Sequence, residues 1–427
     1  MWVTAPRPAS VADRGPADDG ASHAVTGMTD PRLRWTMVLA LLLPVAMFGQ
    51  VFSYIKQIAP LWALSKAFPI LTLPLALLLV RWPRPPATRQ LLTSFAWLLI
   101  VPSIIAIWTF QQSFLIGLTA QVKLLPILYF FSFLALLRWW RPSLDEVAAS
   151  FLAAALLTIA ALVLLWLLAP QSWYIAPFRI DQAPLLSTDG RGNRIRMPMF
   201  FALIGIFYCY RRWLADRRIG WLIGVAIGFA LTIGVVRQRT TVIGLAGVIA
   251  INAFAAAGPR VRLLLVAVIP LALVALFSVP YLATVFDTSQ ASGFDTRWIT
   301  SVKVVDFLGS NPFAWGFGVG SISPLDRAGM MQYFNHFFFL ADVAWLGVVF
   351  EFGIVGALLI LAIPLRALML TRAARRDDAS PFLMALQDYV VFALITSPLN
   401  PLTLTPGEIA TIMAVAVYAI DHRRIRA

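Results

Sequence analysis

Runs of about 20 apolar residues recur along almost the whole chain, separated by short basic links. Each run is long enough to cross about 30 Å of hydrocarbon as an α-helix. Strands of a membrane barrel would instead alternate apolar and polar residues over about 10 positions. The composition agrees, since 60% of the residues are hydrophobic and only 13% are charged. We therefore expect an all-α polytopic membrane protein.

The apolar runs predict about 12 transmembrane helices in a single helical domain over residues 35–427. Residues 1–34 lack periodicity and are expected to form a disordered cytoplasmic tail. The expected spans are 35–55, 57–80, 91–110, 118–137, 148–168, 197–210, 220–236, 240–257, 263–283, 343–365, 382–398 and 407–420.

The basic links indicate how the chain is oriented. If the N-terminus is inside, the inner links and the two tails hold 22 of the 34 Lys and Arg residues. The positive-inside rule therefore favours cytoplasmic N- and C-termini. The two large loops, about 169–196 and 284–342, are then periplasmic, and the second lies between the ninth and tenth spans. Because the basic residues are spread in small groups between spans, the net charge of +14 does not indicate nucleic-acid binding.

Two arginines on the predicted outer side stand out. Arg237 and Arg239 lie in VVRQRTTVIG, a link so short that both must sit at or inside the membrane boundary. An ionisable residue there is unfavourable and is a functional-site hypothesis. Two interpretations stay open: snorkelling to outer phospholipid phosphates, or binding of a phosphorylated lipid substrate by the guanidinium forks. The turn-rich loop 181–197 likewise either folds over a headgroup or merely connects two spans.

The longest break in the apolar pattern is the segment 294–356. Its first part contains Arg297 and predicts a helix lying on the outer surface. The apolar stripe expected for that helix is Ile299, Val302, Val305 and Phe307. The sequence NPFAWGFGVGS follows, and its glycines permit a tight turn and close approach of the backbone to a ligand.

At these residues the chain resembles the O-antigen ligase and polymerase family of bacterial membrane proteins. The resemblance has three parts, all on the predicted outer side. They are Arg239 at the start of a middle span, the series Arg297, Pro312, Gly316, Gly318 and Gly320, and an Asn335-His336 element before a span with Gly347, Gly353 and Gly356.

The resemblance implies a membrane glycosyltransferase of GT-C-like architecture in the bacterial inner membrane. The donor would be a glycan on undecaprenyl pyrophosphate. The acceptor would be a lipid A core sugar in a ligase, or the end of another lipid-linked glycan in a polymerase. The resemblance implies neither a metal nor a cofactor.

The residue types agree with this chemistry. A pyrophosphate leaving group gains negative charge in the transition state, which Arg239 and Arg297, helped by Arg237, would stabilise. A histidine that titrates near neutrality suits removal of the acceptor proton, and His336 is the histidine on the outer side. The ordinary alternative is an interfacial residue in an aromatic belt.

The residues expected to bind substrate are Arg237, Asn335, Asp342, Glu351, Gly318 and Gly320. For Asp342 and Glu351 two interpretations stay open. They orient a catalytic side chain or contact acceptor hydroxyls, or they are structural ion-pair partners within the bundle.

Two other functions compete with this hypothesis. A twelve-span transporter would predict two similar halves, and no such repeat is seen. A flippase for lipid-linked glycan would carry cations in a central cavity, whereas here the arginines concentrate at the outer rim. Metal chemistry is not expected, because one cysteine and one outer histidine form no ligand cluster.

Overall fold

The computed structural model describes residues 33–175, 185–189, 192–263, 292–322, 340–376, 380–403 and 405–426. The predicted tail 1–34 therefore lies almost wholly outside the described residues. The chain divides by contacts into Met1–Arg34 and Trp35–Ala427, and the second unit carries the fold.

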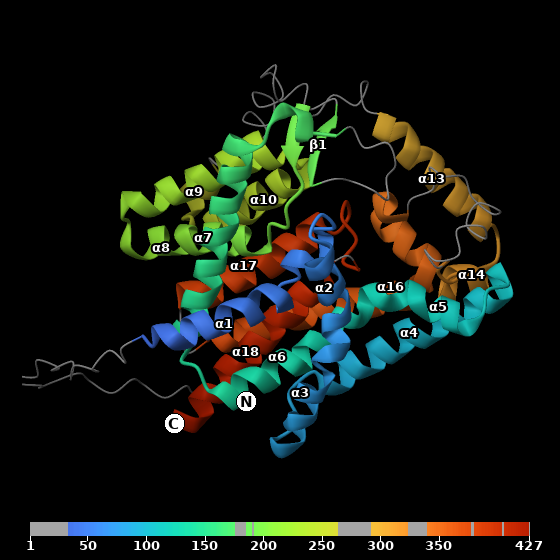
Figure 1. Cartoon of the computed structure of the whole chain (residues 1–427), viewed down its shortest axis with the longest axis horizontal. Coiled ribbons are helices and arrows are strands. Elements are labelled where there is room, and N and C mark those ends of the chain that lie inside the picture. The colour runs from blue at the N-terminus through green and yellow to red at the C-terminus, as the bar shows by residue number, and fades with distance from the viewer. Residues whose placement is uncertain are drawn as a thin grey trace, which may run out of the picture. The chain divides into compact units, whose positions relative to one another are not determined.

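Helices account for nearly all of that unit (Figure 1). The α-helices are α1 (Trp35–Phe48), α2 (Ala59–Leu71), α3 (Leu73–Leu77), α4 (Thr88–Phe110), α5 (Phe114–Ala120), α6 (Tyr129–Trp140), α7 (Leu144–Leu168), α8 (Phe200–Asp216), α9 (Ile219–Leu231), α10 (Arg239–Ala256), α13 (Ser292–Leu308), α14 (Pro312–Phe317), α16 (Ala344–Arg375), α17 (Pro381–Thr396) and α18 (Pro406–Arg426). Short 3₁₀ segments are η1 (Val51–Tyr54), η2 (Leu78–Arg81), η3 (Gln121–Leu128), η4 (Gln171–Trp173) and η7 (Leu340–Val343), and η6 (Thr232–Val236) is a π-helical turn.

Eight helical segments of the described residues are long and apolar enough to cross a membrane. They are Trp35–Ser53, Ala59–Arg81, Thr88–Phe110, Phe114–Trp140, Leu144–Leu168, Ile219–Val236, Arg239–Ala256 and Ala344–Arg375. This confirms the coarse expectation of a helical chain built from apolar spans. The count of 12 stays a prediction. Helices α8 and α17 have only 17 and 16 residues, α18 is not among the eight segments, and the ninth expected span lies mostly outside the described residues.

Helices α6 and α18 form the centre of the bundle. Residues 129–137 of α6 and residues 409–419 of α18 are buried without interruption, and the two helices pack against each other. A helix that is apolar on all sides is buried on all sides. By contrast α7 exposes a row of leucines, including Leu157, Leu164 and Leu168, as expected for a face in contact with lipid.

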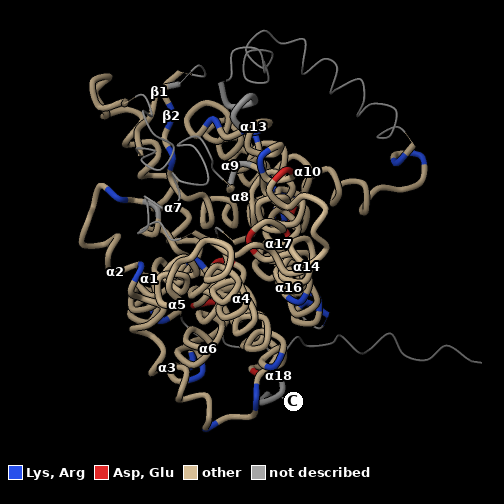
Figure 2. Tube along the Cα trace, turned by 90° about the vertical axis from the view of Figure 1, so that its right-hand side faces the viewer, with Lys and Arg blue, Asp and Glu red and all other residues tan. Residues whose placement is uncertain are grey.

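One buried and one partly buried ion pair join helices of the bundle. Arg211 of α8 donates to both carboxylate oxygens of Asp388 in α17, each at 2.6 Å. Asn252 of α10 bonds to both residues, at 2.8 Å and 3.0 Å. Arg138 of α6 donates to Asp421 of α18 at 2.5 Å and 3.1 Å. Figure 2 shows that acidic residues are few along the helices. Loss of one acidic partner would therefore leave a mostly buried arginine without a counter-charge.

The loop 169–196 contains the one departure from an all-α chain among the described residues. Strands β1 (Leu186–Asp189) and β2 (Gly192–Ile195) pair antiparallel, with Leu186 opposite Ile195. The first residue of β2, Gly192, has φ of 81°, a conformation that glycine adopts without strain. The expected turn-rich loop is therefore a short hairpin.

The expected helix after residue 294 is present as α13, and most of its predicted apolar stripe faces away from the rest of the protein. Ile299, Val302 and Val305 are 46%, 40% and 45% exposed. The buried side consists of Thr300, Val304 and Leu308, and Phe307 packs beside them. The helix therefore packs on the protein through one face and leaves the predicted apolar stripe exposed, and contact of that stripe with the membrane stays a prediction.

Candidate functional site

The glycine-rich loop after α14 lies across a kink in α16. Gly353 interrupts the helix with φ of 67° and ψ of 179°. The backbone N–H of Val319 donates to the Phe350 carbonyl at 2.8 Å, so the loop bonds to the helix just before the kink. A Cβ on Gly318 would lie 2.6 Å from the Glu351 carbonyl oxygen, and one on Gly320 would lie 2.5 Å from that of Pro102. Packing against α16 and α4 explains why glycine occupies these positions, and their role in substrate binding stays a prediction.

Glu351, one of the predicted substrate-binding residues, has an ion-pair partner that the sequence did not indicate. Lys123 of η3 donates to its carboxylate, with Nζ 2.5 Å from Oε2. The same ammonium group lies 5.4 Å from the centre of the Phe352 ring. The side chains are 31% and 13% exposed, so the pair is half-buried. Glu351 thus has the structural partner that one of its two interpretations required.

Arg237 and Arg239 occupy the link between η6 and α10. Arg237 ends the π-helical turn in a left-handed conformation, with φ of 52°, and its Nε donates to the Gly234 carbonyl at 3.0 Å. Arg239 is the first residue of α10. The helix dipole makes the N-terminus of α10 positive, and the two arginines add further positive charge. Both effects favour an anion at this position.

The β1–β2 hairpin packs against this link. A Cβ added to Gly192 would lie 2.5 Å from Nη1 of Arg237. The hairpin brings two further arginines, because Arg194 and Arg196 both donate through Nε to the buried Ser187 hydroxyl, at 3.2 Å and 3.0 Å. The hairpin therefore packs on the arginine link at Arg237, and whether the loop folds over a headgroup or only connects two spans stays open.

The structure assembles the predicted site residues in two groups. Gly318 and Glu351 meet at the kink of α16, with Gly320 beside them against α4, and Arg237 and Arg239 lie at the start of α10. Helix α17 packs against both α10 and α16. The Nε1 of Trp345 donates to the Ser397 hydroxyl at 3.1 Å, which joins the start of α16 to the end of α17.

The other predicted residues lie on α13, in η7 and outside the described residues. Arg297 is exposed on α13, which packs on α16. Asn335 and His336 lie outside the described residues, as does the side chain of Asp342 in η7.

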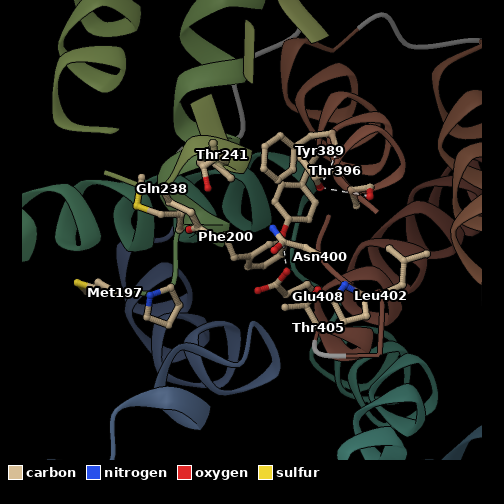
Figure 3. A pocket seen from close by; sticks show the side chains of 16 residues that line it. Met197, Phe200, Gln238, Thr241, Tyr389, Thr396, Asn400, Leu402, Thr405 and Glu408 are labelled. Atoms are coloured by element: carbon tan, nitrogen blue, oxygen red, sulfur yellow. Dashed lines mark hydrogen bonds between the residues drawn. The ribbon is translucent and has the colours of Figure 1, made fainter. Parts of the chain in front are cut away.

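A cavity of about 200 Å³ opens beside the arginine link, between the starts of α8, α10 and α18 and the end of α17 (Figure 3). Its polar lining residues are Gln238, Thr241, Tyr389, Thr396, Asn400, Thr405 and Glu408. Gln238, the residue between the two arginines, is part of this lining, so the cavity and the link share a wall.

Glu408 is the carboxyl group of this cavity and is only 4% exposed. It accepts hydrogen bonds from the hydroxyls of Tyr389 and Thr405. Gln50 fixes its position, because the Gly407 N–H donates to Gln50 Oε1 at 2.8 Å.

Sequence reasoning missed both Glu408 and Lys123. Each is an ionisable residue inside an expected span, at 407–420 and 118–137. An ionisable residue inside a span is itself a signal for function. On this signal we predicted only the outer arginines as site residues.

Within the described part of the chain, no group of three or more His, Cys, Asp or Glu residues is placed to hold a metal ion. No model of a known protein family matches the chain, and no curated protein sequence matches it. The functional argument therefore depends on the arginines, the hairpin and the cavity.

Proposed function

We propose that this protein is a membrane glycosyltransferase of the bacterial inner membrane, with cytoplasmic N- and C-termini and a GT-C-like architecture. It transfers a glycan from undecaprenyl pyrophosphate to a sugar acceptor on the periplasmic face, as O-antigen ligases and polymerases do. The acceptor is a lipid A core sugar or the end of another lipid-linked glycan.

The observation that supports this proposal most is the gathering of Arg194, Arg196, Arg237 and Arg239 on one hairpin and one link, beside a polar cavity. Guanidinium groups match phosphate oxygens in a bidentate way. A lipid pyrophosphate carries its charge at the membrane boundary, where the sequence predicts this link to lie. Four arginines there suit an anion with more than one negative charge.

The chemistry assigns a role to each group. The acceptor hydroxyl oxygen forms a bond to the anomeric carbon while the bond from that carbon to the pyrophosphate oxygen breaks. The pyrophosphate leaves with the electron pair, and Arg239 and Arg297 stabilise its growing charge. His336 takes the acceptor proton. Binding of the sugars would fall to the substrate-binding residues predicted from the sequence.

Surface polysaccharide in cells provides the test. With Arg239→Ala or His336→Ala as the sole copy, we expect loss of the mature polysaccharide while the amount of protein in the membrane stays normal. Arg260→Ala is the matched control, because Arg260 is exposed on the predicted cytoplasmic side, and it should leave the polysaccharide unchanged. Wild-type polysaccharide from either site variant would contradict the assigned roles.

The same cells separate the two acceptors. Polymer that accumulates on the lipid carrier indicates a ligase, whereas single repeat units on the final acceptor indicate a polymerase.

A flippase for lipid-linked glycan is the second candidate, favoured by the buried network of Arg211, Asp388 and Asn252 inside the bundle. Charged groups within a bundle often mark a transport path. A flippase would move the lipid across the bilayer without releasing undecaprenyl pyrophosphate, so the release of that product distinguishes the two functions.

A further inference from the structure

We propose that the cavity between α8, α10, α17 and α18 binds one pyranose ring of the glycan, with Glu408 and Asn400 as hydrogen-bond partners of its hydroxyls. This inference rests on the proposed function and adds a sugar subsite to it. Figure 3 shows the side chains of Gln238, Asn400 and Glu408 gathered around the same space from three parts of the bundle.

The lining favours a hydroxyl-rich ligand over an acyl chain. Glu408 is buried, and its partners among the described residues are two hydroxyl groups rather than a cation. A carboxyl group facing only hydrocarbon would be strongly unfavourable. Gln238, Thr241 and Asn400 add further polar groups from the other walls.

The aromatic residues supply the apolar part that a sugar ring also needs. Tyr389 packs edge-to-face on Phe200, with the ring centres 4.9 Å apart, and Phe392 lies 5.6 Å from Tyr389. All three line the cavity. Ligand sites commonly combine apolar walls with a few fixed polar groups.

The sugar and the phosphate suit different parts of the site. Glu408 is a buried carboxyl group bonded to two hydroxyls, so it offers a phosphate group no positive charge in the cavity. Arg237 and Arg239 lie on either side of Gln238, which belongs to the cavity wall. A phosphate held by the arginines and a sugar ring held in the cavity are thus neighbours, as they are in a sugar pyrophosphate.

The cavity has room for a ligand several times larger than a water molecule, and its walls are held in place. A volume of about 200 Å³ exceeds the share of several liquid waters, at about 30 Å³ each. A Cβ on Gly244 of α10 would lie 2.6 Å from the Phe392 ring of α17, so these two helices are in close contact. The start of α18 is anchored by Gln50, which is itself buried.

Equilibrium binding to the purified full chain in lipid nanodiscs tests the subsite without requiring transfer. The probes are undecaprenyl pyrophosphate carrying one N-acetylhexosamine, bare undecaprenyl pyrophosphate, and the methyl glycoside of the same sugar. One variant is Glu408→Gln, which replaces the carboxyl group by an amide. The other is Thr241→Leu, which removes a hydroxyl and fills part of the cavity. The exposed carboxylate variant Asp306→Asn is the control, and the melting temperature of each variant checks folding.

We expect Glu408→Gln and Thr241→Leu each to weaken binding of a sugar-bearing probe by about tenfold, the equivalent of one hydrogen bond. Binding of bare undecaprenyl pyrophosphate should change less than about twofold. An effect on the sugar-lipid identifies the donor sugar as the occupant, whereas an effect on the methyl glycoside alone identifies the acceptor.

Unchanged binding of both sugar probes in both variants would overturn the subsite. A wild-type protein that binds the glycoside through Glu408 but neither pyrophosphate lipid would contradict the proposed function and retain the subsite. A wild-type protein that binds none of the probes would contradict both.

Discussion

Lys123 and Glu351 show how a single ion pair joins distant parts of this chain. The two residues are 228 positions apart, and their contact holds η3 against α16 just before the helix kinks. The pair is half-buried, so the loss of one partner leaves a charge with little compensating solvent.

Neutralising one member of this pair should be more harmful than neutralising both. We expect Lys123→Met to lower the melting temperature in detergent, and the double variant Lys123→Met with Glu351→Leu to recover part of the loss. The coupling free energy between partners in contact is on the order of 0.5–3 kcal/mol. A full double-mutant cycle measures it, and additive effects of the two substitutions would show that the pair does not contribute to stability.

A second prediction for single residues concerns Gly353 in the kink of α16. Its φ of 67° and ψ of 179° belong to a region that is almost exclusive to glycine, and a Cβ there would collide with the Gly316 carbonyl. Gly353→Ala should therefore destabilise the protein by about 1–3 kcal/mol. Gly316→Ala is the control, since a Cβ at Gly316 meets open space. Equal melting temperatures for the two variants would contradict the account of the kink.

At the scale of elements, α13 has two apolar faces. Val304 and Leu308 pack into a cluster with Phe110 and Phe350, whereas Trp298 and Val302 on the other side are 64% and 40% exposed. A helix with an exposed apolar face is typical of the membrane interface.

Spin labels test whether lipid covers the exposed face of α13. In a background with Cys209→Ser, a nitroxide at Val302 should collide more with oxygen dissolved in lipid than with a water-soluble nickel complex. A nitroxide at Ser310, exposed in the turn after the helix, should show the reverse preference. If both positions prefer the nickel complex, α13 lies in water.

The elements also show what the sequence could and could not predict. Long apolar helices such as α4 and α7 were predicted because their length and composition alone decide them. The β1–β2 hairpin was not predicted, because Leu-Ser-Thr-Asp and Gly-Asn-Arg-Ile are too short to show an alternating pattern. For the site, the arginine link was found from its position in the membrane pattern. The cavity was not, since Gln238 and Glu408 line one space only because α17 packs against both α10 and α18.

At the scale of the whole molecule, the cavity brings together the starts of α8, α10 and α18 with the end of α17. When helices cross a bilayer in opposite directions, the starts of those that run one way lie on the same side as the ends of those that run the other way. Combined with the basic links, the arrangement predicts that the arginine link and α13 face the periplasm.

Labelling in membrane vesicles of known orientation tests that prediction. With Cys209→Ser, we expect Ser310→Cys to react with an impermeant maleimide in right-side-out vesicles and to be protected in inverted ones. Arg260→Cys, exposed after α10, should show the opposite pattern. Reaction of both positions on the same side would overturn the orientation and the periplasmic chemistry with it.

The most direct test of the central claim is the release of undecaprenyl pyrophosphate by purified protein supplied with lipid-linked glycan and a sugar acceptor. The account predicts one released carrier for each glycan joined to the acceptor, loss of both products in Arg239→Ala, and wild-type yields in Arg260→Ala. Carrier release without glycan joining, or full activity of Arg239→Ala, would contradict it.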